Sequence, residues 1–182
     1  MKGSAAGLSF FLIALFGTQA LAATTAQRFA TITGTATGAA TNQCDQGYSN
    51  QCPTSSCTCV QIPGAVVGKV PGQLSIAGSG TANVFLTLDN GAATPSAIGN
   101  CTPFFGVAEL TTTRGGKPSS ETLNLTGVLC APLTTANRPI LGGFGISASP
   151  KPTNGGKGFG KFAGTMSPSS VVSLTLHGPI TE

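Results

Sequence analysis

Apolar and polar residues alternate along most of the chain beyond its apolar beginning, which is the period of a β-strand with one buried face. From Phe29 onward the alternation places small or apolar residues on one face, with threonines between them; that face holds Ala30, Ile32, Gly34 and Ala36. The clearest segment is Thr81–Asp89, in which Val84, Leu86 and Leu88 share one face and Phe85 and Thr87 take the other. Both segments are predicted to be strands.

The same alternation predicts further short strands, separated by glycine- and proline-containing turns such as Asp89-Asn90-Gly91. These strands are Cys59–Ile62, Ala65–Val70, Pro103–Thr113, Thr122–Cys130, Ile140–Ala148, Gly158–Met166 and Val171–His177. No segment after the apolar beginning keeps apolar residues at helical spacing without a glycine or proline breaking it. The sequence therefore predicts an all-β fold, a single antiparallel β-barrel or, as the alternative, a β-sandwich.

One segment near the C-terminus also matches a known pattern. Gly158-Phe159-Gly160-Lys161-Phe162-Ala163-Gly164 resembles the G-x-G-[K/R]-F-x-G stretch of secreted β-barrels of the allene oxide cyclase and dirigent type. The resemblance implies an eight-stranded antiparallel barrel with room for an inner cavity, and it carries over no catalytic residue.

The two rings of this segment, Phe159 and Phe162, are three residues apart and face opposite sides of a regular strand. A bulge at Gly160 would bring both inward. We expect the segment to be a bent strand that pairs in antiparallel fashion with Val171–His177, with at least one of the rings in the core.

The beginning of the chain has the features of a secretory signal peptide. Lys2 precedes the apolar run Leu8–Phe16, and Ala20-Leu21-Ala22 offers a cleavage site. The run is about half as long as the ~20 residues that a membrane-spanning helix needs. We therefore predict a signal peptide over residues 1–22, one domain over residues 23–182, and a secreted or periplasmic protein with no membrane span.

Composition narrows the classes of partner. Only 8% of the residues are charged, the net charge is +4, and 40% of the residues are hydrophobic, with 26 glycines. So small and diffuse a charge argues against nucleic-acid binding, and so large an apolar fraction argues against disorder. Membrane barrels carry girdles of aromatic residues, and this sequence has no tryptophan and a single tyrosine beside its phenylalanines, which argues against a membrane barrel.

Four of the six cysteines lie between residues 44 and 59, with the spacing C-x7-C-x4-C-x-C. Structural zinc sites usually contain close C-x2-C pairs, so this spacing favours disulfides in an exported protein. Cys57 and Cys59 are too close in sequence to bond readily to each other. Nested pairing (Cys44–Cys59, Cys52–Cys57) and crossed pairing (Cys44–Cys57, Cys52–Cys59) both remain open. Cys101 and Cys130 would then pair, and the cysteine cluster would form a disulfide-stapled N-terminal loop.

The loop between the first two cysteines is the best binding candidate. Tyrosine and amide side chains can stack on and hydrogen-bond a sugar or peptide, and this loop holds Asp45, Tyr48, Asn50 and Gln51. Elsewhere the sequence lacks the serine-hydrolase, P-loop and dinucleotide-binding motifs, and no cofactor or metal is predicted. Two single candidates for acid–base chemistry remain, His177 and Glu109.

Three functions are compatible with these features. The first is a non-enzymatic exported protein that binds a small ligand or glycan or acts as a surface structural component. The second is an isomerase- or cyclase-like enzyme with a barrel cavity, and the third is a pilus-type subunit. An interior cavity lined by at least two of Glu109, Arg138 and His177 would favour the enzyme, whereas a packed apolar interior would favour a binding or structural protein.

Overall fold

A computed structural model of the protein describes residues 26–41, 52, 54, 56–69, 78–114, 116–131, 136–146 and 157–181. The predicted signal peptide lies outside these residues. The described part consists of strands and one 3-10 helix, η1 (Asn90–Ala92), and contains no α-helix. The strands are β1 (Ala26–Thr35), β2 (Thr37–Thr41), β3 (Cys57–Gly68), β4 (Ser79–Asp89), β5 (Thr94–Ser96), β6 (Gly99–Arg114), β7 (Lys117–Ala131), β8 (Arg138–Ile146), β9 (Lys157–Met166) and β10 (Val171–Thr181).

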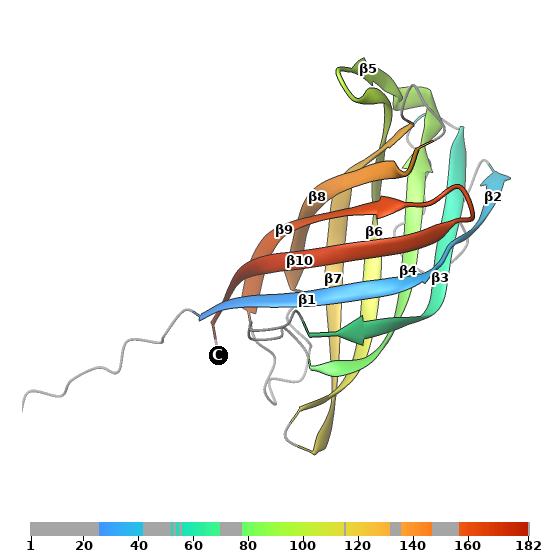
Figure 1. Cartoon of the computed structure of the whole chain (residues 1–182). Coiled ribbons are helices and arrows are strands. Elements are labelled where there is room, and N and C mark those ends of the chain that lie inside the picture. Colours follow the sequence, from blue (N-terminus) through green and yellow to red (C-terminus); the bar gives the residue numbers. More distant parts are fainter. Residues whose placement is uncertain are drawn as a thin grey trace, which may run out of the picture.

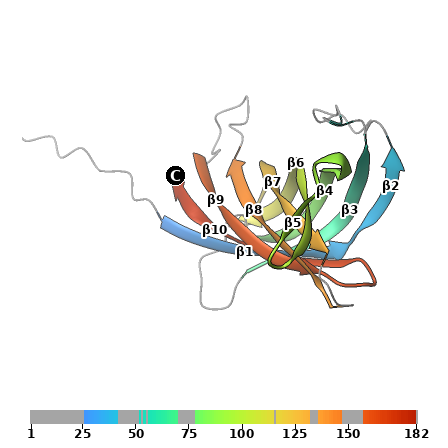
Figure 2. The same cartoon turned by 90° about the horizontal axis from the view of Figure 1, so that it is seen from above.

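The strands close into an antiparallel barrel. The hydrogen-bonded order is β1-β10-β9-β8-β7-β6-β4-β3, and β3 pairs back with β1 from Thr31↔Gly68 to Thr33↔Val66. β2 continues β1 beyond Ala36, and β5 pairs only with β6, so the closed ring has eight strands. Figure 1 shows β1, β9 and β10 crossing the direction of β4, β6 and β7, and Figure 2 shows the wall curving from β10 round to β3. The predicted barrel is confirmed over the alternative sandwich.

β3 is one bent strand where the sequence pattern predicted two. Ile62 pairs with Val84 and Ala65 with Ala82, so Pro63 and Gly64 oppose a single residue of β4. Gly64 has a φ of 60°, in the left-handed region that glycine adopts without strain, and its N–H donates to Asn83 Oδ1 at 2.9 Å. This bulge turns the strand, so that its second half reaches β1 and closes the barrel.

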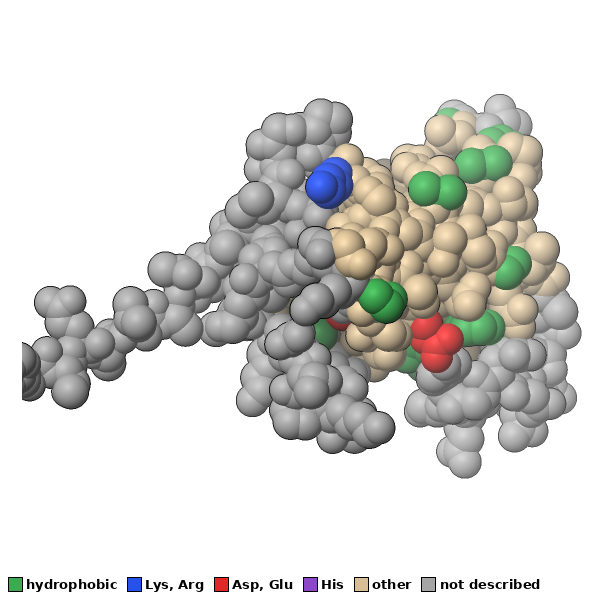
Figure 3. All heavy atoms as spheres, turned by 90° about the horizontal axis from the view of Figure 1, so that it is seen from below, with side chains coloured by type: hydrophobic (Ala, Val, Ile, Leu, Met, Phe, Trp, Pro, Cys, Tyr) green, Lys and Arg blue, Asp and Glu red, His purple; other side chains and the backbone are tan. Residues whose placement is uncertain are grey.

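The apolar faces predicted from the alternation point into the barrel and form one core. The buried cluster includes Ala30 and Ile32 of the first predicted strand, with Ala36 partly buried against it, and Val84, Leu86 and Leu88 of Thr81–Asp89. All eight strands contribute residues to it. Its largest fully buried side chains are Ile32, Ile62, Leu110, Leu123 and Leu176. The outer wall carries threonine, serine and glycine, and the side of the molecule drawn in Figure 3 shows isolated hydrophobic groups and few charges in its described part.

A layer of two rings and two glycines crosses the middle of this core. Phe104 of β6 pairs with Gly127 of β7, Gly127 pairs with Gly142 of β8, and Gly142 pairs with Phe162 of β9. The two rings stack over the glycines with their centroids 6.1 Å apart and their planes 27° apart. A Cβ on Gly127 would lie 2.9 Å from Phe104 Cζ, so the glycines provide the space that the rings occupy.

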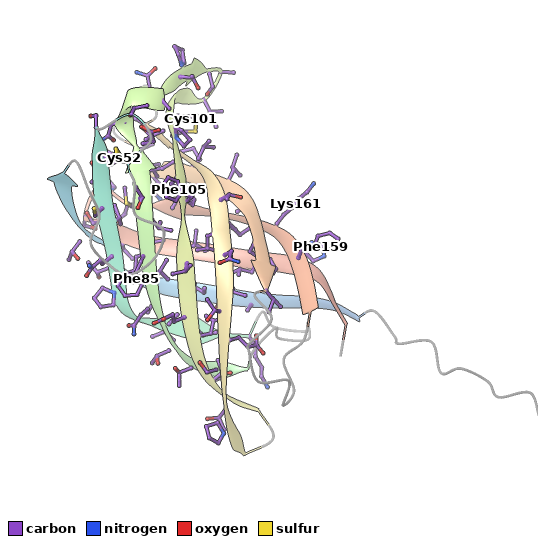
Figure 4. The ribbon with its side chains drawn as sticks, turned by 180° about the vertical axis from the view of Figure 1, so that it is seen from behind. Cys52, Phe85, Cys101, Phe105, Phe159 and Lys161 are labelled. Carbon is purple, nitrogen blue, oxygen red and sulfur yellow. A yellow bond between two sulfur atoms is a disulfide. The ribbon has the colours of Figure 1, made fainter. Side chains whose placement is uncertain are left out.

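The predicted pairing of Gly158–Gly164 is confirmed, but the strand contains no bulge at Gly160. β9 pairs with β10 in the predicted antiparallel arrangement, for example at Leu176↔Phe162, and its register with β8 and β10 is unbroken. Phe162 is therefore buried at 3% exposure, whereas Phe159 faces outward at 71% exposure. Figure 4 shows Phe159 and Lys161 pointing away from the barrel.

The cysteines of the described residues are all oxidised. Cys52 is bonded to Cys57 and Cys101 to Cys130, and Cys59 is also in a disulfide. The Cys52–Cys57 bond makes the crossed pairing wrong and agrees with the nested one; Cys44 lies outside the described residues. In the same part of the chain, no helix is long and apolar enough to cross a membrane.

Candidate functional site

The inner face of the barrel changes from apolar to polar at one end. On β3 the inward row runs Thr58, Val60, Ile62, so a hydroxyl stands at the rim and aliphatic side chains stand behind it. The inward row of β6 begins with Thr102 before Phe104, and that of β8 begins with Arg138 before Ile140. Side chains on a strand alternate between its two faces, so residues two positions apart face the same way. These polar residues therefore lie on the inner face of the barrel, at the end of the apolar rows.

A cavity of about 360 Å³ occupies this opening. Its polar lining comes from Thr37, Thr58, Asn90, Thr102, Arg138 and Ser170. Its apolar lining includes Val60, Leu88, Leu129 and Met166, which also line the barrel interior. Behind them the interior leaves only about 20 Å³, room for little more than one water molecule, so the cavity has a closed apolar floor. Its volume lies within the range of pockets that hold small molecules.

Arg138 is the charged group at this opening within the described part of the chain. It is the first residue of β8, it pairs with Met166 of β9, and its side chain is exposed. Pro139 follows it, and a residue before proline is restricted to extended backbone. The strand therefore fixes the direction in which the arginine leaves the wall.

Two hydrogen bonds of Asn90 hold the opposite part of the rim. The Asn90 N–H donates to the carbonyl oxygen of Ser56 at 2.9 Å, and Asn90 Nδ2 donates to Thr58 Oγ1 at 3.0 Å. Nearby, the Ala36 N–H donates to the carbonyl oxygen of Ser170 at 2.8 Å, which joins the end of β1 to the β9–β10 turn. Three polar lining residues are thus fixed by contacts to neighbouring backbone or side chains.

Both described disulfides lie at this end of the barrel (Figure 4). Cys101 and Cys130 are directly opposite each other on β6 and β7, beside Thr102 and Leu129 of the cavity wall. Cys52 and Cys57 tie the segment before β3 to its first residue, and Thr54 Oγ1 from that segment donates to Asp89 at the end of β4. Among the described residues, the disulfides with known partners therefore lie beside the cavity.

Within the described residues, one group of possible metal ligands occurs, where the segment before β3 meets the end of β4. The sulfur atoms of Cys52 and Cys57 and a carboxylate oxygen of Asp89 lie within 4.8 Å of one another. The two sulfurs are bonded to each other, so they provide no thiolate to a cation. This group therefore stabilises the loop as a disulfide and a hydrogen bond.

The structure separates the sequence-predicted site residues. Glu109 is half-buried on the outer face of β6, and His177 is exposed on the outer face of β10. Arg138 alone of the three predicted cavity residues lines the opening. The predicted binding residues Asp45, Tyr48, Asn50 and Gln51 lie outside the described residues.

Sequence reasoning missed the polar rim itself, which includes Thr58, Asn90 and Thr102. The signal that could have identified the rim is its spacing from the core residues. Each of these residues is two positions from an inward apolar residue on the same strand or its extension, so each continues the inward row with a polar side chain.

The chain was also compared with known proteins. Comparison with protein-family models, with curated proteins and with solved structures finds no match.

Proposed function

We propose that this is a non-enzymatic, exported binding protein that takes a small amphipathic ligand into the open end of its barrel. The observation that carries the proposal is the 360 Å³ cavity with an apolar floor and a polar rim. Binding sites for small molecules combine these two features, because apolar walls supply affinity and a few placed polar groups supply orientation. The disulfides are compatible with an oxidising compartment outside the cytoplasm.

The make-up of the cavity favours binding over catalysis. An enzyme that moves protons needs a group that gains and loses a proton near the working pH, positioned next to a second reacting group. Arginine side chains do not give up their proton in proteins, and Arg138 is the one ionisable residue lining the cavity in the described part. Threonine hydroxyls and the amide of Asn90 orient a ligand without reacting with it.

The rim is also held in place before any ligand arrives. The Asn90–Thr58 and Ala36–Ser170 hydrogen bonds and the Cys101–Cys130 disulfide fix three sides of the opening. A site that is already ordered loses less conformational entropy on binding, which strengthens affinity. A purely structural surface protein would have no need of an ordered, open cavity.

The test uses N-phenyl-1-naphthylamine, a neutral aromatic probe whose fluorescence rises in apolar surroundings. Ala131, an exposed cavity residue at the end of β7, is replaced by tryptophan to fill the opening. The matched control is Thr126→Trp, which adds the same side chain to the exposed outer face of the same strand. Circular dichroism and urea unfolding establish that both variants fold.

We expect saturable binding of the probe to the wild type and to Thr126→Trp, and binding at least about tenfold weaker to Ala131→Trp, a loss of roughly 1.4 kcal/mol. Equal binding by the two variants would place the probe elsewhere on the surface. No saturable binding to the folded wild type would remove the proposed function and leave the structural role as the better hypothesis.

A further inference from the structure

Two of the polar residues that line the barrel opening, Arg138 and Thr58, have hydrogen-bond donors to offer a ligand. Arg138 contributes only N–H donors. Its guanidinium makes no hydrogen bond and no ion pair with any residue in the described part of the chain. We infer that the ligand of this cavity carries an anionic oxygen group, such as a carboxylate, that binds Arg138. The inference rests on the proposed function and specifies the chemistry of its ligand.

Thr58 adds a second donor on the other side of the opening. Its oxygen already accepts a hydrogen bond from Asn90 Nδ2, at 3.0 Å. The O–H hydrogen of Thr58 remains to be donated, and this residue lines the cavity. An ionised carboxylate only accepts hydrogen bonds, so it complements an arginine and a threonine hydroxyl in this state.

The charges around the cavity favour an anion as well. The carboxylate of Asp89 is only 5% exposed and accepts a hydrogen bond from Thr54, and it does not line the opening. Glu109 lies on the outer wall of β6. Arg138 therefore lines the cavity without a competing acid among the described lining residues, and its positive charge attracts an anion that enters.

The floor of the cavity limits the apolar part of the ligand. Leu88, Leu129 and Met166 lie between the opening and the interior, which has only about 20 Å³ to spare. A long acyl chain would have to open a packed core to enter, whereas a fused-ring or short-chain acid fits above the floor. The ligand class is thus a compact aromatic or short aliphatic acid.

The experiment compares two probes that share one aromatic framework. 8-Anilino-1-naphthalenesulfonate carries a sulfonate that N-phenyl-1-naphthylamine lacks, so the pair isolates the contribution of one negative charge. Arg138→Gln removes the cation at the opening, and Arg138→Lys retains the charge. Lys161→Gln is the control for loss of a positive charge, since Lys161 is exposed on the outer face of β9 (Figure 4).

We expect the wild type to bind the anionic probe more tightly than the neutral one, and Arg138→Gln to weaken the anionic probe about tenfold. The same variant should leave the neutral probe within about twofold, and Lys161→Gln should leave both within about twofold. Arg138→Lys should recover part of the lost affinity. Raising the ionic strength should weaken the anionic probe in the wild type and much less in Arg138→Gln, because salt screens the charge.

Two results would overturn the inference alone, and a third would overturn the proposed function as well. If Arg138→Gln and Lys161→Gln weaken the anionic probe equally, Arg138 has no special role. If the wild type binds the neutral probe at the cavity but binds the anionic one no better, the cavity takes a neutral ligand and the proposed function stands. If the folded wild type binds neither probe, both the inference and the proposed function fail.

Discussion

The glycine at position 142 is where the packing of the barrel can be tested most sharply. Gly142 faces inward on β8 between Gly127 and Phe162, whereas Gly145, three residues later, faces outward. Neither residue has a positive φ, so alanine can adopt the backbone of both. A Cβ on Gly145 would meet no atom within 4 Å. A Cβ on Gly142 would lie 2.9 Å from Gly127 Cα and closer still to Phe162 Cζ and the Thr126 carbonyl oxygen.

The magnitude follows from what must move. Two of the three atoms near a Gly142 Cβ belong to the backbone of β7, which is held in the ladder and cannot rotate away. Overpacking of this kind typically lowers stability by about 1–3 kcal/mol. Both substitutions also reduce the entropy of the unfolded chain, which stabilises by about 0.4–1 kcal/mol. That contribution is common to the two variants, so their difference reports the packing alone.

The assay is urea unfolding of Gly142→Ala and Gly145→Ala beside the wild type. With a slope of about 2 kcal/mol per molar urea, the midpoints of the two variants should differ by roughly 0.5–1.5 M. Gly145→Ala should unfold at or slightly above the wild-type midpoint. If the two variants unfold at the same midpoint, the rings of Phe104 and Phe162 do not stack over the glycine row, and the order of side chains in the core is different.

Three further predictions use the same assay or a thiol count. Phe162→Ala should lower the free energy of unfolding by about 3–5 kcal/mol, and Phe159→Ala, at an exposed position, by no more than about 0.5 kcal/mol. Equal losses would contradict the assignment of the two rings to opposite faces of β9. Replacing Cys101 and Cys130 together by serine should destabilise by about 3–4 kcal/mol, since the bond closes a loop of 29 residues; an unchanged midpoint would show that it does not constrain the unfolded chain. Thiol titration of the exported, unreduced, denatured protein should find almost no free thiol, and two or more would refute the disulfide assignment.

The period-two pattern carried most of the information about the fold. A strand such as Thr81–Asp89 is amphipathic over its whole length, so its inward face follows directly from residue spacing. The bend of β3 did not follow, because Pro63 and Gly64 usually end a strand and here they form a bulge inside one. The facing of Phe159 and Phe162 needed the register, which depends on pairing with two neighbouring strands that a single segment does not specify.

The candidate site was harder to predict because its residues come from several separate segments of the chain. Arg138, Thr58 and Thr102 lie on three different strands, and each is an ordinary polar residue at the start of an apolar row. In the antiparallel order, every second strand runs in the same direction, so β3, β6 and β8 begin at the same end of the barrel. Only closure of the barrel brings these three strand starts around one opening. The stronger sequence signals, Glu109 and His177, faced outward because their positions have the opposite parity to the core.

The described disulfides lie at the end of the barrel that holds the cavity. Away from the opening, the interior is filled by rings and aliphatic side chains, and Gly127 and Gly142 let β7 and β8 approach the rings of Phe104 and Phe162 closely. At the opening a cavity replaces that packing, and unfilled apolar volume lowers stability. The disulfide between β6 and β7 and the one before β3 act at this end. They hold the rim residues near one another without filling the space between them, as the proposed binding function requires.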